Sequence, residues 1–282
     1  MSGSATAPRV AVVGHVEWLD FAVVDHVPVP GEIVTASEHF ACAAGGGAVA
    51  AVQLRKLAGA AAFLTALGGD ELAARAEAEL REQHGIELYT ARRPRLQRRA
   101  FSHLDAHAER TITVLGERLV PHGDDPLPWE SLREADGVYL TGGDAAAARA
   151  ARGARTLVAS ARAHETLLAS GVVPDVLVAS ASDEKECAGA AALPAPCWLV
   201  LTHGGQGGHW EGADGTRGSW PAARPPGAPV DAYGCGDSFA AGLTYGLAAG
   251  MGLDAALALA ARCGAHCLTG RGPYAAQLAT VS

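Results

Sequence analysis

Short apolar runs alternate with helix-length segments over the second half of the chain. Four of these runs are predicted strands: 137–140, 156–158, 175–178 and 198–202. Strands that alternate with helices in this way predict βαβ units and a parallel sheet covered on both faces. Two longer Ala-rich segments, 237–250 and 253–268, are predicted helices. The second half of the chain therefore predicts an α/β architecture.

The first half begins with the same alternation and then departs from it. Its predicted elements are a strand at 9–14, a helix at 48–57, a strand at 61–67 and a helix at 70–84. Two extended segments, 17–40 and 97–120, do not fit the alternation, and the second turns at 106–109. They predict a small β-rich lid on a larger body. Because no segment has the composition of a linker, we expect one domain over 1–282, with lid strands within about 16–40 and 97–120.

Composition and charge exclude several classes of protein. With 49% hydrophobic and 18% charged residues, the chain can bury a sizeable core, which excludes a disordered segment. The net charge of −8 argues against a nucleic-acid partner. The uncharged stretch 238–253 is shorter than the roughly 20 residues that span a bilayer. With no Cys-x-x-Cys pair and no signal-peptide pattern, a cytoplasmic protein without membrane partners is expected.

The scarcity of lysine excludes two common ways of handling ATP. Lys56 and Lys185 are the only lysines. Neither follows a glycine and precedes Ser or Thr, as the lysine of a P-loop does. Neither lies in the V-A-I-K strand of a protein kinase. Any phosphate chemistry must therefore rest on another architecture.

The strongest candidate for chemistry is the segment 231–237, directly before a predicted helix. Gly234 and Gly236 permit backbone conformations that a Cβ would forbid, so that free N–H groups at the helix start can converge on an anion. Asp237 adds a carboxylate beside this anion site, which is the pairing that phosphoryl transfer requires. An ordinary helix with Asp237 as its cap is the alternative interpretation.

Three further segments have weaker signals. The glycine-rich loop 201–208 follows an apolar strand and can line a phosphate or a ribose. Asp183 and Glu186 can hold Mg²⁺ through water, or simply begin a solvated helix. A run of arginines over 92–99 is either a solvated face or, beside the lid, a contact for a phosphate.

Taken in this order, these segments resemble the ribokinase-like (PfkB) family of sugar kinases over nearly the whole chain. The segment 231–237 resembles the family signature D-T-x-G-A-G-D, with Ala232 in place of Thr and Cys235 in place of the middle Ala. The resemblance implies a three-layer α/β/α body with a mostly parallel central sheet and a small β-rich lid. It also implies a kinase that uses ATP and Mg²⁺.

The same resemblance implies roles for single residues around that signature. Asp237 corresponds to the catalytic base, and the backbone N–H groups over 234–237, including those of Cys235 and Gly236, correspond to the anion hole. Asp231 and Tyr233 lie where relatives bind a monovalent cation such as K⁺. The lid implies a homodimer, because lids of this type pair between subunits in the family.

The nucleotide side is implied by two motifs. The loop from Thr202 to Gly207 is similar to the T-L-G-x-x-G loop that lines the nucleotide. The segment from Asp183 to Glu186 is similar to N-x-x-E, which implies that Glu186 acts on Mg²⁺ through water. Asp183 replaces the Asn of that motif and adds negative charge. The residues that this places beside ATP are Asp183, Thr202, Gly204, Gly207 and Gly236.

The acceptor side departs most from the family pattern. Ala50 stands where the N-terminal motif has Asn, and the expected substrate Asp falls on Leu19, with Asp20 one place later. One place on a strand means the opposite face, so Glu17, which shares the face of Leu19, is the better candidate to hold a sugar hydroxyl. The candidate substrate-binding residues are Glu17, Asp20, Gly45, Gly46 and Asp237.

These features together predict an ATP-dependent carbohydrate kinase with a sugar or sugar-like small molecule as acceptor. Three alternatives stay open. One is a nucleoside kinase of the same family, and another is a silent sensor that binds sugar or nucleotide without turnover. The third is a hydrolase, because the segment 236–240 nearly spells G-x-S-x-G but ends in Ala240.

Overall fold

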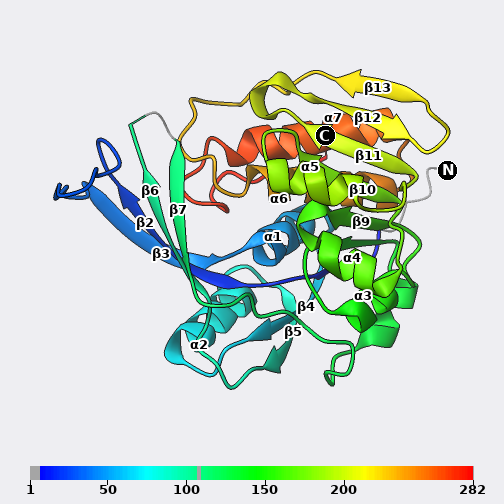
Figure 1. The fold of residues 1–282 in the computed structure, drawn as a ribbon, viewed down its shortest axis with the longest axis horizontal. Coiled ribbons are helices and arrows are strands. Elements are labelled where there is room, and N and C mark those ends of the chain that lie inside the picture. Colours follow the sequence, from blue (N-terminus) through cyan, green and yellow to red (C-terminus); the bar gives the residue numbers. More distant parts are fainter. Residues whose placement is uncertain (1–6, 107–108, 282) are drawn as a thin grey trace.

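The computed structural model describes residues 7–106 and 109–281 (Figure 1). Within these residues, nine strands form a large sheet in the order β13-β12-β11-β10-β9-β8-β1-β4-β5. Its strands are β1 Val10–Val13, β4 Ala62–Leu67, β5 Glu87–Arg92, β8 Gly137–Leu140, β9 Leu157–Ser160, β10 Val176–Ser180, β11 Trp198–Thr202, β12 Gly208–Gly212 and β13 Arg217–Trp220. The strands from β11 to β5 are parallel, and only the edge hairpin of β12 and β13 runs antiparallel.

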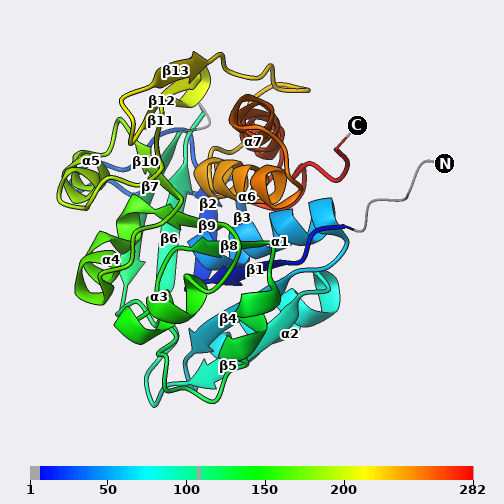
Figure 2. The same cartoon turned by 90° about the vertical axis from the view of Figure 1, so that its right-hand side faces the viewer.

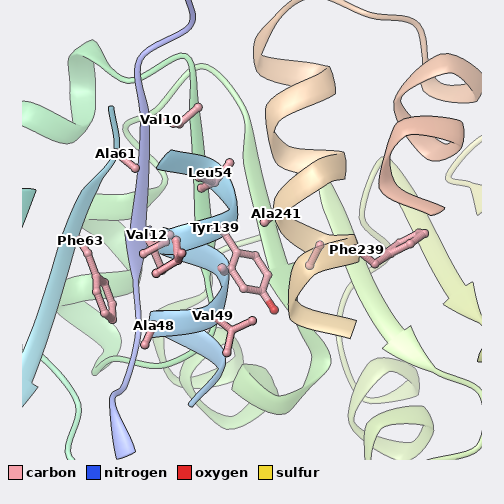
Figure 3. Packing of buried hydrophobic residues seen from close by; sticks show 14 of the residues in the cluster. Val10, Val12, Ala48, Val49, Leu54, Ala61, Phe63, Tyr139, Phe239 and Ala241 are labelled. Carbon is pink, nitrogen blue, oxygen red and sulfur yellow. The ribbon is translucent and has the colours of Figure 1, made fainter. Parts of the chain in front are cut away.

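Helices cover both faces of the large sheet (Figure 2). The helices are α1 Gly46–Ala58, α2 Glu71–Ala78, α3 Ala145–Ala151, α4 His164–Ser170, α5 Glu184–Ala191, α6 Cys235–Ala248 and α7 Leu253–Cys267. Side chains alternate along β1, so Val10 and Val12 pack in one buried cluster with α1, α6 and α7 (Figure 3). Ala11 and Val13 pack in a second cluster with α3, α4 and α5. This is the predicted three-layer α/β/α body.

The lid is a separate sheet of order β3-β2-β6-β7. Its strands are β2 Glu17–Val23, β3 Glu38–Ala44, β6 Arg99–Leu104 and β7 Arg110–Leu115. Leu19 and Phe21 of β2 are fully buried, and Phe21 packs against the ring of Tyr233, directly before α6. The lid is thus packed against the segment that the sequence singles out for chemistry.

The structure adds details that the sequence patterns do not indicate. The predicted helix at 70–84 is α2, capped by the side chain of Asp70, followed by a π-helical turn over Glu79–Gln83. The predicted lid turn at 106–109 includes 107–108, which lie outside the described residues. No helix of the described residues is long and apolar enough to cross a membrane.

The chain changes direction at β1, and this change positions the site. β1 lies between β4 and β8, so the strands that follow it extend to opposite sides. In open α/β sheets, ligands bind beyond the carboxyl ends of the strands at such a switch point. The residues that lie just beyond these ends are His15 after β1, Thr141 and Gly142 after β8, and Arg162 after β9.

Candidate active site

Asp237 lies in the first turn of α6. Gly234 is the N-cap residue, with φ of +83°, and no side chain caps the helix. The alternative interpretation of Asp237 as the cap is therefore wrong. Its half-buried carboxylate accepts no hydrogen bond from the described residues. A methyl group on Gly46 would approach its Oδ1 to 2.7 Å, so a glycine at this position keeps the carboxylate accessible.

The electrostatic surroundings of Asp237 suit a proton acceptor. Burial raises its pKa to about 6, while Arg162 and Arg110 act in the opposite direction and lower it. The negative charges of Glu186 and Glu17 raise it further. A pKa near neutrality lets a carboxyl group take a proton from a hydroxyl group and release it again.

The start of α6 also presents unpaired backbone donors. The first N–H groups of a helix have no partner within it, and the helix dipole adds partial positive charge there. Gly236 is exposed, with nothing within 4 Å of where its Cβ would stand. Gly234 is needed for another reason, since a Cβ there would lie 2.9 Å from Cγ1 of Val49. Among these donors, the N–H of Cys235 donates to the Ala232 carbonyl at 3.5 Å, so those left for a ligand in the first turn of α6 are the N–H groups of Gly236 and Asp237.

The geometry excludes the hydrolase alternative. Ser238, which would be the nucleophile, is fully buried, and its hydroxyl accepts a hydrogen bond from the side-chain amide of Gln277 at 3.1 Å. A hydroxyl group held in this way cannot reach a substrate.

Asp183 and Glu186 follow β10 at the start of α5, and both contact Arg162. Asp183 caps α5 by accepting hydrogen bonds from the backbone of Lys185 and Glu186. Glu186 is buried, and it accepts from Nε of Arg162 at 2.5 Å and from the Ser180 backbone at 2.8 Å. Beside them is a cavity of about 590 Å³, lined by Arg110, Arg162, Ser180, Ser182, Asp183, Glu184 and Lys185.

The glycine-rich loop begins at the neighbouring strand end. Thr202 is the β11 partner of Ser180, and its hydroxyl donates to the Ala179 carbonyl at 3.4 Å. Gly204 and Gly207 both have positive φ. A Cβ on Gly207 would collide with the backbone of β13, whereas one on Gly204 would meet nothing within 4 Å. Packing against β13 therefore explains why a glycine is needed at position 207, whereas the space beside Gly204 is open to a ligand.

On the other side of Asp237, Glu17 is the centre of a buried network. Its Oε1 accepts from the hydroxyl of Tyr233 and its Oε2 from Nε of Arg98, each at 3.0 Å. The Tyr233 hydroxyl in turn accepts from the backbone N–H of Gly45 at 3.0 Å. Glu17 and Leu19 lie on the buried side of β2. Asp20 lies on the opposite side and pairs with Arg99 and, at 3.5 Å, with His39.

Asp231 is a fully buried carboxylate that contacts only backbone. It accepts from the N–H groups of Tyr233 at 2.8 Å and Gly272 at 3.2 Å, and among the described residues it has no ion-pair partner. Burial raises its pKa, while the two hydrogen bonds oppose that shift. The Tyr233 side chain, which the sequence analysis assigned to the same cation site, turns instead toward Glu17.

Sequence reasoning missed four polar side chains that surround these acids: His15, Arg110, Arg118 and Arg162. Arg162 and His15 follow the carboxyl ends of predicted parallel strands, a position that by itself indicates a ligand edge. Arg110 comes from the lid, where Nη1 donates to the carbonyl of Ala232 at 2.5 Å. The lid residue Arg110 gave no signal in the sequence.

Comparisons with known proteins place the chain in a family. Residues 7–280 match the model of the pfkB family carbohydrate kinases, and the chain belongs to this family, which confirms the resemblance seen in the sequence. None of the curated proteins matches the sequence.

Solved structures share the fold at low sequence identity. The ribokinase of Thermotoga maritima is 18% identical with a TM-score of 0.75, and the match covers 96% of each chain. The ribokinase of Arabidopsis thaliana, solved with ribose and ATP, is 18% identical with a TM-score of 0.72, again over 96% of each chain. The nucleoside kinase of Methanocaldococcus jannaschii is 16% identical with a TM-score of 0.74, over 98% of this chain and 96% of that one.

Proposed function

We propose that this protein transfers the γ-phosphoryl group of ATP to a hydroxyl group of a sugar or sugar-like small molecule. The observation that carries this proposal is the carboxylate of Asp237, which is half-buried and accepts no hydrogen bond from the described residues. It lies in the first turn of α6, where the N–H groups of Gly236 and Asp237 have no partner within the helix. An aspartate that only stabilised the helix would use its carboxylate as a cap.

In the proposed reaction, Asp237 accepts the proton of the acceptor hydroxyl as that oxygen attacks the phosphorus atom. The N–H groups over 234–237 stabilise the negative charge on the transferred group, and the guanidinium of Arg162 adds positive charge near Asp237. ATP itself lies in the cavity between Arg110 and Asp183, beside Thr202 and Gly204.

The acids of this cavity fit a hydrated magnesium ion. Each oxygen of Glu186 already accepts one hydrogen bond, and a carboxylate oxygen can accept two. Glu186 therefore suits a contact through metal-bound water, which Mg²⁺ retains readily, while Asp183 lines the cavity directly. When bound with ATP, the ion neutralises phosphate charge.

A monovalent cation site beside Asp231 is part of the proposal. The fully buried carboxylate of Asp231 accepts hydrogen bonds from two N–H groups, and the charge of Arg110 acts on it without forming an ion pair. A cation such as K⁺ would stabilise this buried negative charge further. Asp231 and the backbone of Tyr233 are the residues that would hold it.

The test is an ATP-consumption screen with Mg²⁺ over pentoses, hexoses, sugar phosphates, sugar acids and nucleosides, followed by Asp237→Asn on the best acceptor. Removal of a positioned base costs roughly 10²–10⁴-fold. We expect kcat to fall by that factor. ATP should still bind to the variant, and calorimetry measures this binding. Near-wild-type turnover in Asp237→Asn would overturn the assignment, and ATP binding without turnover on any acceptor would favour the sensor.

A further inference from the structure

A second, smaller cavity lies beyond the carboxyl ends of β8 and β9. It has a volume of about 200 Å³ and is lined by Arg118, Val120, Gly142, Gly143, Arg162, Ala163, Glu165 and Thr166. The nucleotide cavity contains none of these residues except Arg162. The two cavities therefore share Arg162 as a lining residue and are otherwise lined by different residues.

Arg118 is the unusual residue of this cavity. Its side chain is half-buried, yet it forms no hydrogen bond or ion pair with any of the residues that the structure describes. A guanidinium carries five donors and a fixed charge, and removing both from water without a partner is costly. Burial lowers its pKa, and the nearby charges of Arg98 and Arg162 lower it further.

The neighbouring arginines already have partners. Arg98 turns inward to Glu17, and Arg162 pairs with Glu186. The rest of the predicted basic run pairs outward with carboxylates, in the ion pairs Arg92–Glu77, Arg93–Asp125, Arg95–Glu117 and Arg99–Asp20. Glu17 is thus engaged by another arginine, and among the described residues neither Asp237 nor Glu165, which lines the same cavity, forms an ion pair with Arg118. Arg118 therefore keeps donors that an anionic ligand can use.

His15, which lies beside Gly142 but is not one of the lining residues, provides an independent observation next to this cavity. It is only 7% exposed, and its Nδ1 is a buried polar atom with no hydrogen-bond partner. A methyl group on Gly142 would lie 3.9 Å from this Nδ1 and 4.0 Å from Cδ of Arg118, so both side chains flank Gly142. Burial and the nearby arginines Arg118, Arg98 and Arg162 lower the pKa of His15, so it stays neutral near pH 7 and its Nδ1 can carry a proton to donate.

The cavity adjoins the reacting carboxylate. Gly142 follows Thr141 directly, and a methyl group on Gly46 would lie 3.1 Å from Oγ1 of Thr141 and 2.7 Å from Oδ1 of Asp237. Arg118 is also close enough to Glu17 and Asp237 for both charges to act on it. A small molecule with one hydroxyl at Asp237 can therefore extend past Gly46 and Thr141 to Arg118.

We infer that the acceptor of this enzyme is anionic, and that a phosphate or carboxylate group at its far end binds Arg118 with the help of His15. This inference rests on the proposed kinase function and narrows its acceptor to sugar phosphates or sugar acids. The guanidinium of Arg118 can donate two parallel hydrogen bonds to the anionic group, and Nδ1 of His15 can donate a third. The cavity on the Asp183 side remains for the phosphates of ATP.

The first test compares neutral and anionic acceptors of one skeleton: fructose against fructose 6-phosphate, and glucose against gluconate. We expect kcat/KM to favour an anionic member by at least 10-fold. A preference for the neutral members in both pairs, with turnover that depends on Asp237, would overturn this inference and leave the kinase function standing. Absence of turnover on every acceptor would instead overturn the kinase function.

The second test separates the acceptor from the nucleotide. Hydrogen bonds to charged groups predict that Arg118→Gln raises KM for the anionic acceptor roughly 10- to 100-fold, without change in KM for ATP. Arg118→Lys, which keeps the charge but not the fork, should recover part of the loss. Arg95→Gln, which removes an exposed, paired arginine, is the matched control. A rise in KM for ATP alone would assign Arg118 to the nucleotide and overturn the inference.

A binding measurement without turnover completes the design. In the absence of ATP, the preferred anionic acceptor should raise the melting temperature of the wild-type protein and of Arg95→Gln. The same concentration of acceptor should leave the melting temperature of Arg118→Gln unchanged. Equal protection of all three proteins would contradict a role for Arg118 in binding.

Discussion

The carboxyl group of Asp237 holds its proton more tightly than an exposed aspartate does, because burial raises its pKa to about 6. Only the ionised form can accept a proton, so kcat/KM should fall tenfold per pH unit below about pH 6 and level off above it. The profile is best measured with an acceptor that does not itself titrate between pH 5 and 8. Arg162 lowers this pKa, so Arg162→Gln should shift the acid limb to higher pH. A limb that does not move in that variant would assign it to another group.

Glu17 and Asp20 are both carboxylates on β2, and they offer a matched comparison. Glu17 faces Tyr233 and Arg98 inside the protein, whereas Asp20 pairs with Arg99 on the other side of the strand. Glu17→Gln should raise KM for the acceptor by roughly 10-fold or more, because a charged acceptor of hydrogen bonds is replaced by a neutral one. Asp20→Asn should change it little, and neither should change KM for ATP. A larger effect of Asp20→Asn would place the pocket on the opposite face of the lid.

At the scale of elements, β10 and α5 form one unit that presents Glu186. Asp183 caps the helix, and the backbone of Ser180 holds the Glu186 carboxylate. Glu186→Gln should raise the Mg²⁺ concentration for half-maximal rate several-fold, with a smaller change in KM for the acceptor, because a neutral amide accepts weakly from metal-bound water. Glu211→Gln, an exposed acid of β12, is the control. An unchanged Mg²⁺ titration would leave Glu186 as a structural partner of Arg162.

Features that depend on a sequence pattern within a few residues could be predicted from the sequence. Gly234 before α6, the strand parity of Glu17 and the lid segments all follow from patterns within a few residues. The meeting of His15 with Gly142 could not be predicted in this way. These residues become neighbours only because β1 pairs with β8, with Val13 beside Leu140. Such a contact is a property of sheet order, which single apolar runs do not encode.

At the scale of the whole molecule, both sheets contribute residues to the candidate site. The large sheet brings the ends of β1, β8, β9, β10 and β11 to a single edge, where the acids and arginines gather. The lid adds Glu17 from β2 and Arg110 from β7 (Figure 1). Arg162 lines both of the cavities that we propose for the acceptor and for the nucleotide.

The bond between Glu17 and the Tyr233 hydroxyl joins the lid to the segment that begins α6. A protein engineer who grafts the lid of a relative onto this body would therefore exchange only half of a matched pair. The graft would leave the Tyr233 hydroxyl buried without its carboxylate, at a cost of about 1–3 kcal/mol for an unsatisfied polar group. In this protein, the lid cannot be replaced alone to change the acceptor preference, because β2 and residue 233 have to be exchanged together.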